Sequence, residues 1–160
     1  AGRTIGVVGA GRIGRRVIQI ARGFGMTAVA TDAVPDAEAA HRLGFEYVSL
    51  PELLRRSDVV SLHVPGSAET RALISDAEFA QMKPGSVLIN TARGGVVNAA
   101  ALVRALSSGR LAGAGLDVLS SEPPAADAGQ GVTKTSPYSS IVSVRRASPR
   151  SAMPSRSRFR

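Results

Sequence analysis

The fold of this chain is decided by Ile5-Gly6-Val7-Val8-Gly9-Ala10-Gly11-Arg12-Ile13-Gly14. The first four residues form an apolar run that is typical of a buried strand, and the last six have the spacing Gly-x-Gly-x-x-Gly. A second apolar run ends at Asp32, eighteen residues beyond Gly14. A strand, a glycine turn, a helix and a distant acid in this order are typical of a dinucleotide-binding unit.

Each residue type in the glycine turn suits a pyrophosphate. Gly9 permits the tight turn, Gly11 lets the backbone approach the phosphates, and Gly14 lets the helix pack on the strand. The helix that begins at Arg12 directs the positive end of its dipole toward the anion. Asp32 accepts hydrogen bonds from the adenosine ribose hydroxyls, and its negative charge repels a phosphate there. The sequence therefore predicts NAD rather than NADP as the cofactor.

Beyond the turn, apolar runs and amphipathic segments alternate. The pattern predicts strands at residues 3–8, 27–31, 47–48, 58–63, 86–90 and 112–118, and helices at 12–24, 35–43, 51–56, 76–82 and 99–108. Six strands separated by helices predict an α/β fold, a Rossmann-type doubly wound parallel sheet in the order 3-2-1-4-5-6. Its ligand is expected at the switch point beside the first strand.

The first predicted helix has an apolar row along its length. Ile13, Val17, Ile20, Ala21 and Phe24 recur at helical spacing. This spacing predicts that the five side chains share one face and turn it toward the core.

The composition changes after Pro124. Residues 1–124 contain 13 Lys/Arg and 11 Asp/Glu, whereas residues 125–160 contain seven Lys/Arg and one acid, out of a net charge of +8. We expect residues 1–124 to form an NAD-binding domain. We expect residues 125–160, rich in Ser, Arg and Pro, to be disordered apart from a strand at 138–144, or to derive from a shifted reading frame.

Several classes of function are disfavoured by composition. The basic segment can contact phosphates nonspecifically, but Tyr138 and Phe159 are its only aromatic residues, so we expect no specific nucleic-acid partner. Cysteine is absent, and no run approaches the ~18 consecutive apolar residues of a membrane span. No secretory signal pattern is present. We expect a cytoplasmic protein with no metal site and no membrane partner.

Three further blocks follow the glycine turn. They are SDVVSLHVP at residues 57–65, KPGSVLINTARGG at 83–95 and GLDVLSSEP at 115–123. In this order and spacing the chain resembles the D-isomer-specific 2-hydroxyacid dehydrogenases over about residues 3–124. The resemblance implies hydride transfer between NAD(H) and a small 2-keto or 2-hydroxy acid.

The resemblance also implies residue roles. Backbone groups of Arg12 and Ile13 are implied to contact the pyrophosphate, and Thr70 is implied to lie near the phosphates. Val64 and Pro65 are implied to flank the adenine. The nicotinamide side is implied to be lined by Thr91, Ala92 and Arg93, and the nicotinamide ring region to be held by Asp117. Two catalytic positions are implied: Arg93 binds substrate, and Glu122 partners the catalytic histidine. These types suit the chemistry, because the planar fork of arginine binds a carboxylate and polarises the adjacent carbonyl, and a glutamate raises the pKa of a histidine that acts as general acid.

Other interpretations stay open when residue type alone is considered. Arg93 also suits a solvated loop, Glu122 a loop acid and Asp117 a turn cap. His63 is the type of residue that catalyses proton transfer, but the resemblance places it beside the adenine-side loop, which favours a packing role. His41 is expected on the solvated surface.

The chain departs from the family pattern in two places. No histidine follows His63, whereas the proton-transferring histidine of the family follows the glutamate, and only eight residues precede Gly9. We therefore expect a fragment, with the substrate domain absent, that binds NAD(H) and shows little turnover. The alternative is a non-enzymatic, NAD-dependent sensor or interaction module. The resemblance further implies a homodimer through the NAD domain.

Overall fold

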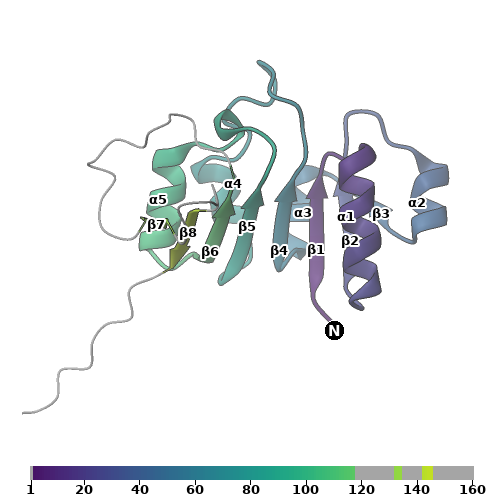
Figure 1. The fold of residues 1–160 in the computed structure, drawn as a ribbon, viewed down its shortest axis with the longest axis horizontal. Helices are drawn as coiled ribbons and strands as arrows, with labels where there is room; N and C mark the ends of the chain where they lie inside the picture. Colours follow the sequence, from purple (N-terminus) through teal and green to yellow (C-terminus); the bar gives the residue numbers. More distant parts are fainter. Residues whose placement is uncertain (1, 118–131, 135–141, 146–160) are drawn as a thin grey trace, which may run out of the picture.

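A computed structural model describes residues 2–117, 132–134 and 142–145 of the chain. These residues form an eight-stranded sheet with helices on both faces (Figure 1). In chain order the strands are β1 (Thr4–Val8), β2 (Thr27–Thr31), β3 (Glu46–Tyr47), β4 (Val59–Leu62), β5 (Ser86–Asn90), β6 (Leu111–Leu116), β7 (Val132–Lys134) and β8 (Val142–Arg145).

The strands are arranged in the order β3-β2-β1-β4-β5-β6-β8-β7. The pairings among β1 to β6 are all parallel, so the predicted doubly wound order 3-2-1-4-5-6 is confirmed. β8 pairs antiparallel with β6, and β7 with β8. β8 overlaps the strand predicted at residues 138–144, and the rest of the segment after residue 124, apart from β7, lies outside the described residues.

Helices connect the parallel strands. They are α1 (Arg12–Gly23), α2 (Ala37–Leu43), α3 (Leu50–Arg56), α4 (Asp76–Gln81), the 3-10 turn η1 (Gly94–Val96) and α5 (Ala99–Ser107). α1 and α2 cover one face of the sheet, while α3, α4 and α5 cover the other. The chain moves to the other face of the sheet between β3 and β4. The crossovers from β1 to β3 run along the sheet in one direction and those from β3 to β6 run in the other, and right-handed crossovers in opposite directions lie on opposite faces.

Short polar residues set the helix boundaries. The carboxylate of Asp36 accepts a hydrogen bond from the N–H of Ala39 at 2.9 Å, and Asn98 accepts from Ala101 at 3.0 Å. The second helix therefore begins after Asp36 rather than at residue 35, because that side chain satisfies an N–H of its first turn. Gly44, with φ of +66°, ends the same helix in the left-handed conformation.

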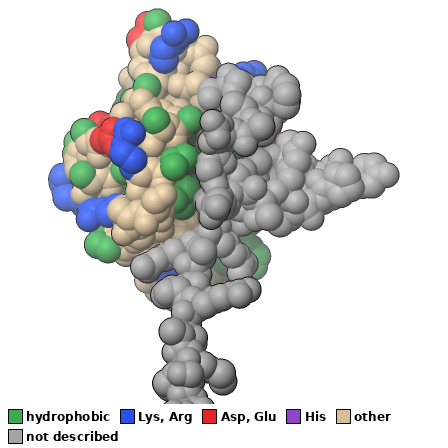
Figure 2. Space-filling view, turned by 90° about the vertical axis from the view of Figure 1, so that its left-hand side faces the viewer, with side chains coloured by type: hydrophobic (Ala, Val, Ile, Leu, Met, Phe, Trp, Pro, Cys, Tyr) green, Lys and Arg blue, Asp and Glu red, His purple; other side chains and the backbone are tan. Residues whose placement is uncertain are grey.

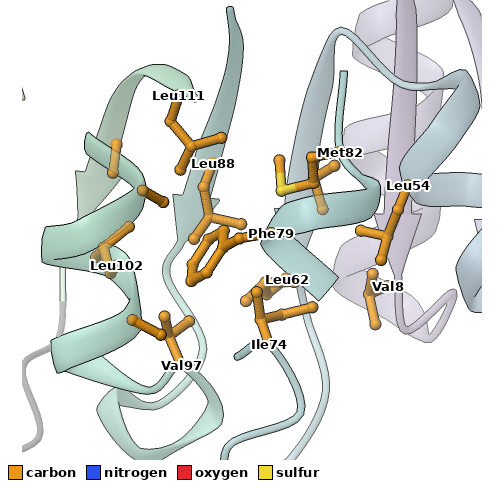
Figure 3. Close-up of a cluster of buried hydrophobic side chains, with 14 of the residues drawn as sticks. Val8, Leu54, Leu62, Ile74, Phe79, Met82, Leu88, Val97, Leu102 and Leu111 are labelled. Carbon is orange, nitrogen blue, oxygen red and sulfur yellow. The ribbon is translucent and has the colours of Figure 1, made fainter. Parts of the chain in front are cut away.

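The larger core lies between the sheet and the helices α3, α4 and α5. Leu62 of β4 and Leu88 of β5 are completely buried, and Phe79 and Met82 at α4 are buried with them. Figure 3 shows Phe79 directed toward Leu88, with Leu102 of α5 on the same side of the sheet. This packing fixes the positions of β4 and β5, whose carboxyl ends carry most of the candidate site.

The rotation of α1 differs from the prediction. Ile18 is completely buried and Ala21 is 5% exposed, but Ile13, Ile20 and Phe24 are 66%, 54% and 75% exposed. The prediction that these three side chains face the core is therefore wrong. They form an apolar ridge on the surface of the helix.

The reason for this rotation lies in the glycine turn. A Cβ on Gly14 would lie 2.0 Å from the carbonyl oxygen of Gly9, so the helix approaches the turn most closely at Gly14. Residues four and seven positions further along share that face of a helix, and they are Ile18 and Ala21. The close backbone contact at Gly14 therefore determines which face of α1 is buried. A prediction from the spacing of apolar residues does not detect such a contact, because glycine has no side chain.

Charged side chains are dispersed over the described surface. On the face shown in Figure 2, Lys and Arg lie in separate groups, some of them beside acidic side chains. Arg56, for example, contacts Glu46 at 2.8 Å and Glu52 at 3.0 Å. Within the described ranges, none of the helices is long and apolar enough to cross a membrane.

Candidate functional site

The three glycines of the turn have three different structural roles. Gly9 has φ of +94°, and a Cβ there would lie 2.8 Å from the carbonyl of His63, so a side chain is excluded twice. Gly14 brings α1 against the turn. A Cβ on Gly11, by contrast, would meet nothing within 4 Å, so this residue faces open space. The open position is the one at which the sequence predicts backbone contact with phosphates.

The N-terminus of α1 borders this open space. Gly11 is the N-cap residue, and in the described part of the chain no side chain caps the helix. The first N–H groups of a helix have no acceptor within the helix, and the dipole makes this end positive. The backbone at Arg12 and Ile13 is therefore suited to an anion such as a pyrophosphate.

Asp32, at the end of β2, holds the glycine turn in place. Its Oδ2 accepts a hydrogen bond from the N–H of Ala10 at 2.7 Å, and its Oδ1 accepts from the N–H of Val34 at 3.0 Å. A carboxylate oxygen accepts more than one hydrogen bond, so both oxygens retain capacity for ribose hydroxyls. The acid therefore has a structural role in addition to the predicted ligand role.

Arg15 is a residue of the turn that sequence reasoning missed. Its Nε donates to the carbonyl oxygen of Ala10 at 2.8 Å, and its Nη1 lies 3.0 Å from Oδ2 of Asp36. The pKa of Asp36 is lowered, chiefly by the N–H of Ala39 and further by Arg15. Arg15 thus links the glycine turn to the start of α2, a contact between segments that no local pattern indicated.

The loop after β4 carries three predicted cofactor residues. Val64 is half-buried against the core, and Pro65 is exposed. The hydroxyl of Thr70 donates to the carbonyl of Pro65 at 2.6 Å and accepts from the N–H of Ser67 at 2.9 Å. The side chain of Thr70 therefore stabilises the loop formed by residues 65 to 70.

His63 lies beneath the glycine turn. Its backbone N–H donates to the backbone carbonyl of Val8 at 2.7 Å, and the Nε2 of its side chain lies 2.9 Å from the hydroxyl of Ser61. Burial lowers the pKa of His63 and favours the neutral imidazole. These contacts are those of a packed side chain.

The loop after β5 and Asp117, the first residue after β6, meet at Asn90, a second residue that sequence reasoning missed. Asn90 is 1% exposed, donates from Nδ2 to the carbonyl of Arg93 at 3.0 Å, and accepts from the N–H of Ala92 at 3.1 Å. The backbone carbonyl of Asn90 accepts a hydrogen bond from the backbone N–H of Asp117 at 3.0 Å. The buried side-chain amide thereby holds the segment Thr91 to Arg93, and the backbone carbonyl of the same residue joins this segment to Asp117. The only signal in the sequence was a polar residue at the end of an apolar strand.

The predicted residues gather at one edge of the sheet. The glycine turn and the loops after β4, β5 and β6 all follow the carboxyl ends of parallel strands, at the top of Figure 1. In open α/β sheets this edge, beside the switch point, is where ligands bind. Glu122 lies outside the described residues. Among those that are described, no group of three or more His, Cys, Asp or Glu side chains could hold a metal ion.

Comparison with known families gives one match across most of the chain. A family model described as "D-isomer specific 2-hydroxyacid dehydrogenase, NAD binding domain" matches residues 1–136. The glyoxylate reductase of Thermococcus litoralis is 48% identical over 122 residues, which are 76% of this chain and 37% of that protein.

Solved structures agree with this match. The holo form of D-mandelate dehydrogenase from Rhodotorula graminis has a TM-score of 0.74 and 49% identity, covering 77% of this chain and 36% of that one. D-lactate dehydrogenase with NAD+ from Lactobacillus jensenii has a TM-score of 0.70 and 38% identity, covering 74% and 35%. The chain therefore spans little more than a third of the length of these relatives.

Proposed function

The chain belongs to the D-isomer-specific 2-hydroxyacid dehydrogenase family and has its NAD-binding domain, and from this we propose that NAD(H) binds beside a 2-keto or 2-hydroxy acid at the edge of the sheet where the parallel strands have their carboxyl ends. One observation carries the proposal. The open glycine turn and the Asn90-linked loops, with Arg93 and Asp117, lie at the same edge of the sheet.

The residues at this edge fit the cofactor. The uncapped start of α1 at Gly11 suits the pyrophosphate, and Asp32 suits the adenosine ribose. Thr91, Ala92 and Asp117 would then border the nicotinamide. Bound NAD(H) supplies or accepts the hydride, so the protein's own task is position and charge.

Arg93 is the proposed substrate-binding residue. It is exposed, and among the described residues the one hydrogen bond of its side chain runs from Nη1 to the carbonyl of Ala92 at 2.8 Å. The rest of its planar fork remains available to a carboxylate, and the same positive charge polarises the adjacent carbonyl. Loss of Arg93 should therefore weaken binding of the acid while leaving NAD(H) bound.

Proton transfer is the step for which this chain is least equipped. Glu122 is the proposed partner of a catalytic histidine, but the sequence contains no histidine after His63. Hydride transfer to a keto acid produces an alkoxide that a general acid must protonate, and the residue type that resembles the family's proton donor is missing from this sequence after His63. We therefore expect NAD(H) binding with little turnover by the 160-residue chain.

Two measurements test the proposal. Titration of the purified chain with NADH, followed by fluorescence, should give saturable binding. Oxidation of D-lactate and glycolate, followed by NADH absorbance, should stay close to the rate without protein. Absence of NADH binding would refute the cofactor role, and rapid oxidation would refute the expectation of little turnover.

A second candidate, NAD-dependent self-association without catalysis, is favoured by one observation. Ile20 and Phe24 form an exposed apolar ridge on α1, the helix whose N-terminus borders the cofactor position. Sedimentation with and without NAD tests this candidate. A change in mass on adding NAD that is lost in Phe24→Ser would support it, and an unchanged mass would exclude it.

A further inference from the structure

A basic pocket lies between the loops that follow β4 and β5. Its volume is about 320 Å³, enough for a ligand of a few heavy atoms. Two arginines, two hydroxyl residues and two glycines supply most of its lining: Arg71, Arg93, Ser67, Thr70, Gly66 and Gly95. The proposed function accounts for Arg93 but gives no task to Arg71.

Neither arginine is neutralised by the described residues. Arg71 and Arg93 are both exposed, and neither forms an ion pair there, whereas Arg56 and Arg104 do. Glu69, the acid of the same loop, interacts with Ser67 rather than with either arginine, which lowers the pKa of its carboxyl. Two positive charges therefore line one small pocket without a compensating carboxylate.

The backbone holds Arg71 at this position. Ala72, the next residue, has φ of +49° and is the only non-glycine residue in the described ranges with a positive φ. Its N–H donates to the carbonyl of Gly95 at 2.8 Å, so the two loops are joined directly beside the pocket. A left-handed alanine is unfavourable and persists only where its surroundings impose it. The loop after β5 thus holds the backbone next to Arg71 in the conformation that places Arg71 at the pocket.

Contact between the loops also shapes the other wall. A Cβ on Gly66 would lie 3.1 Å from Cγ of Arg93, so the stem of Arg93 runs against the backbone of the β4 loop. Arg93 and Arg71 are therefore presented to the same space from two different loops. Neither guanidinium has a carboxylate partner among the described residues, so each is available to a separate anionic group of one ligand.

We propose that Arg71 binds a second anionic group of the substrate, so that the preferred substrates are 2-keto acids with a further carboxylate or phosphonate-like group. This inference rests on the proposed function, in which Arg93 holds the carboxylate next to the carbonyl. Arg71 would then determine specificity, and the two acid groups together would compensate both guanidinium charges.

The test uses matched ligands with the NADH-saturated 160-residue chain. Binding of α-ketoglutarate is compared with α-ketovalerate, which has a methyl group in place of the distal carboxylate, and phosphonopyruvate is compared with pyruvate, all by calorimetry at one ionic strength. We expect at least one dianion to bind about tenfold more tightly than its matched monoanion, since a charge-assisted hydrogen bond contributes on this scale. The pair that shows the preference identifies the second group as carboxylate or phosphonate.

Variants assign the preference to a residue. Arg71→Gln should abolish the preference for the dianion and leave the monoanion affinity unchanged. Arg55→Gln, at an exposed arginine of α3 remote from the pocket, should preserve the preference and so controls for total charge. Equal affinity of dianion and monoanion in the unaltered chain, no detectable dianion binding, or a preference that survives Arg71→Gln would each overturn the inference.

A third variant separates this inference from the proposed function. Arg93→Gln should weaken both members of each pair if Arg93 holds the carboxylate next to the carbonyl. If monoanion binding is unaffected by Arg93→Gln, the proposed role of Arg93 fails. The Arg71→Gln comparison still decides whether the pocket recognises a second charge.

Discussion

The carboxylate of Asp32 lies 2.7 Å from the backbone nitrogen of Ala10, and this hydrogen bond ties the end of β2 to the glycine turn after β1. The residue expected to hold a ribose therefore also supports the turn that is expected to face the phosphates. We therefore expect stability and cofactor affinity to depend on the same acid, and experiment can measure the two effects separately.

Replacement of Asp32 should affect both quantities. We expect Asp32→Ala to lower the free energy of unfolding by about 1–3 kcal/mol, because the N–H groups of Ala10 and Val34 lose their acceptor. NADH affinity should also fall. Urea denaturation and NADH titration of the same preparation measure the two effects. An unchanged stability would show that the hydrogen bonds do not support the turn.

The glycines of the turn should separate fold from binding. Gly11→Ala adds a Cβ in open space, so we expect a change in unfolding free energy below about 1 kcal/mol but at least about tenfold weaker NADH binding. Gly14→Ala places a Cβ 2.0 Å from the carbonyl oxygen of Gly9 and should destabilise by about 3 kcal/mol or more. Gly23→Ala, also in open space but at the other end of α1, is the control. Unaltered NADH binding in Gly11→Ala would argue against phosphate contact at this residue.

The rotation of α1 can be tested with a pair of isoleucines. Ile18→Ala should cost about 2–4 kcal/mol of unfolding free energy, because it leaves a cavity in the core. Ile20→Ala removes the same atoms from a side chain that is 54% exposed and should cost less than about 1 kcal/mol. Thermal and urea unfolding provide the comparison. Equal costs would mean that both side chains are buried and that the helix is rotated differently.

His63 should make stability depend on pH below neutrality. Burial lowers its pKa from the ordinary value of 6.5, so the unfolded chain binds a proton at higher pH than the folded chain does. This contribution to stability is complete well above pH 6.5, and it is lost as pH falls through 6.5 toward the folded pKa. His63→Gln should flatten the stability profile between about pH 7 and 5. Parallel profiles for His63→Gln and the unaltered chain would contradict this.

The hydrogen bond from the Asn90 side chain to the carbonyl of Arg93 should help to hold Arg93 in position. Asn90→Ala removes the acceptor of the Ala92 N–H and the donor to the Arg93 carbonyl in a buried place, so we expect a loss of about 2–3 kcal/mol in stability. Binding of a keto acid to the NADH-bound variant should weaken more than binding of NADH itself. If calorimetry shows both affinities falling equally, Asn90 acts through the fold as a whole and not through the loop of Arg93.

Much of the architecture was predictable because it depends on short-range patterns. The alternation of apolar strands and amphipathic helices indicated the six parallel strands, and the glycine spacing with Asp32 indicated the cofactor. Helix starts were predictable to within a few residues from capping side chains such as Asn98. These signals survive in a single sequence because each depends on neighbours along the chain.

The sequence by itself determined the α/β class, the strand order, the family and NAD as the cofactor. Only the tertiary structure decided which row of α1 is buried, that Asp32 and Arg15 support the glycine turn, that Asn90 joins two loops, and that Arg71 and Arg93 line one pocket. The physical reason is distance along the chain. The hydrogen bond from Ala10 to Asp32, the ion pair of Arg15 with Asp36 and the shared pocket of Arg71 and Arg93 all join segments that come together only when the sheet brings the carboxyl ends of its strands to one edge.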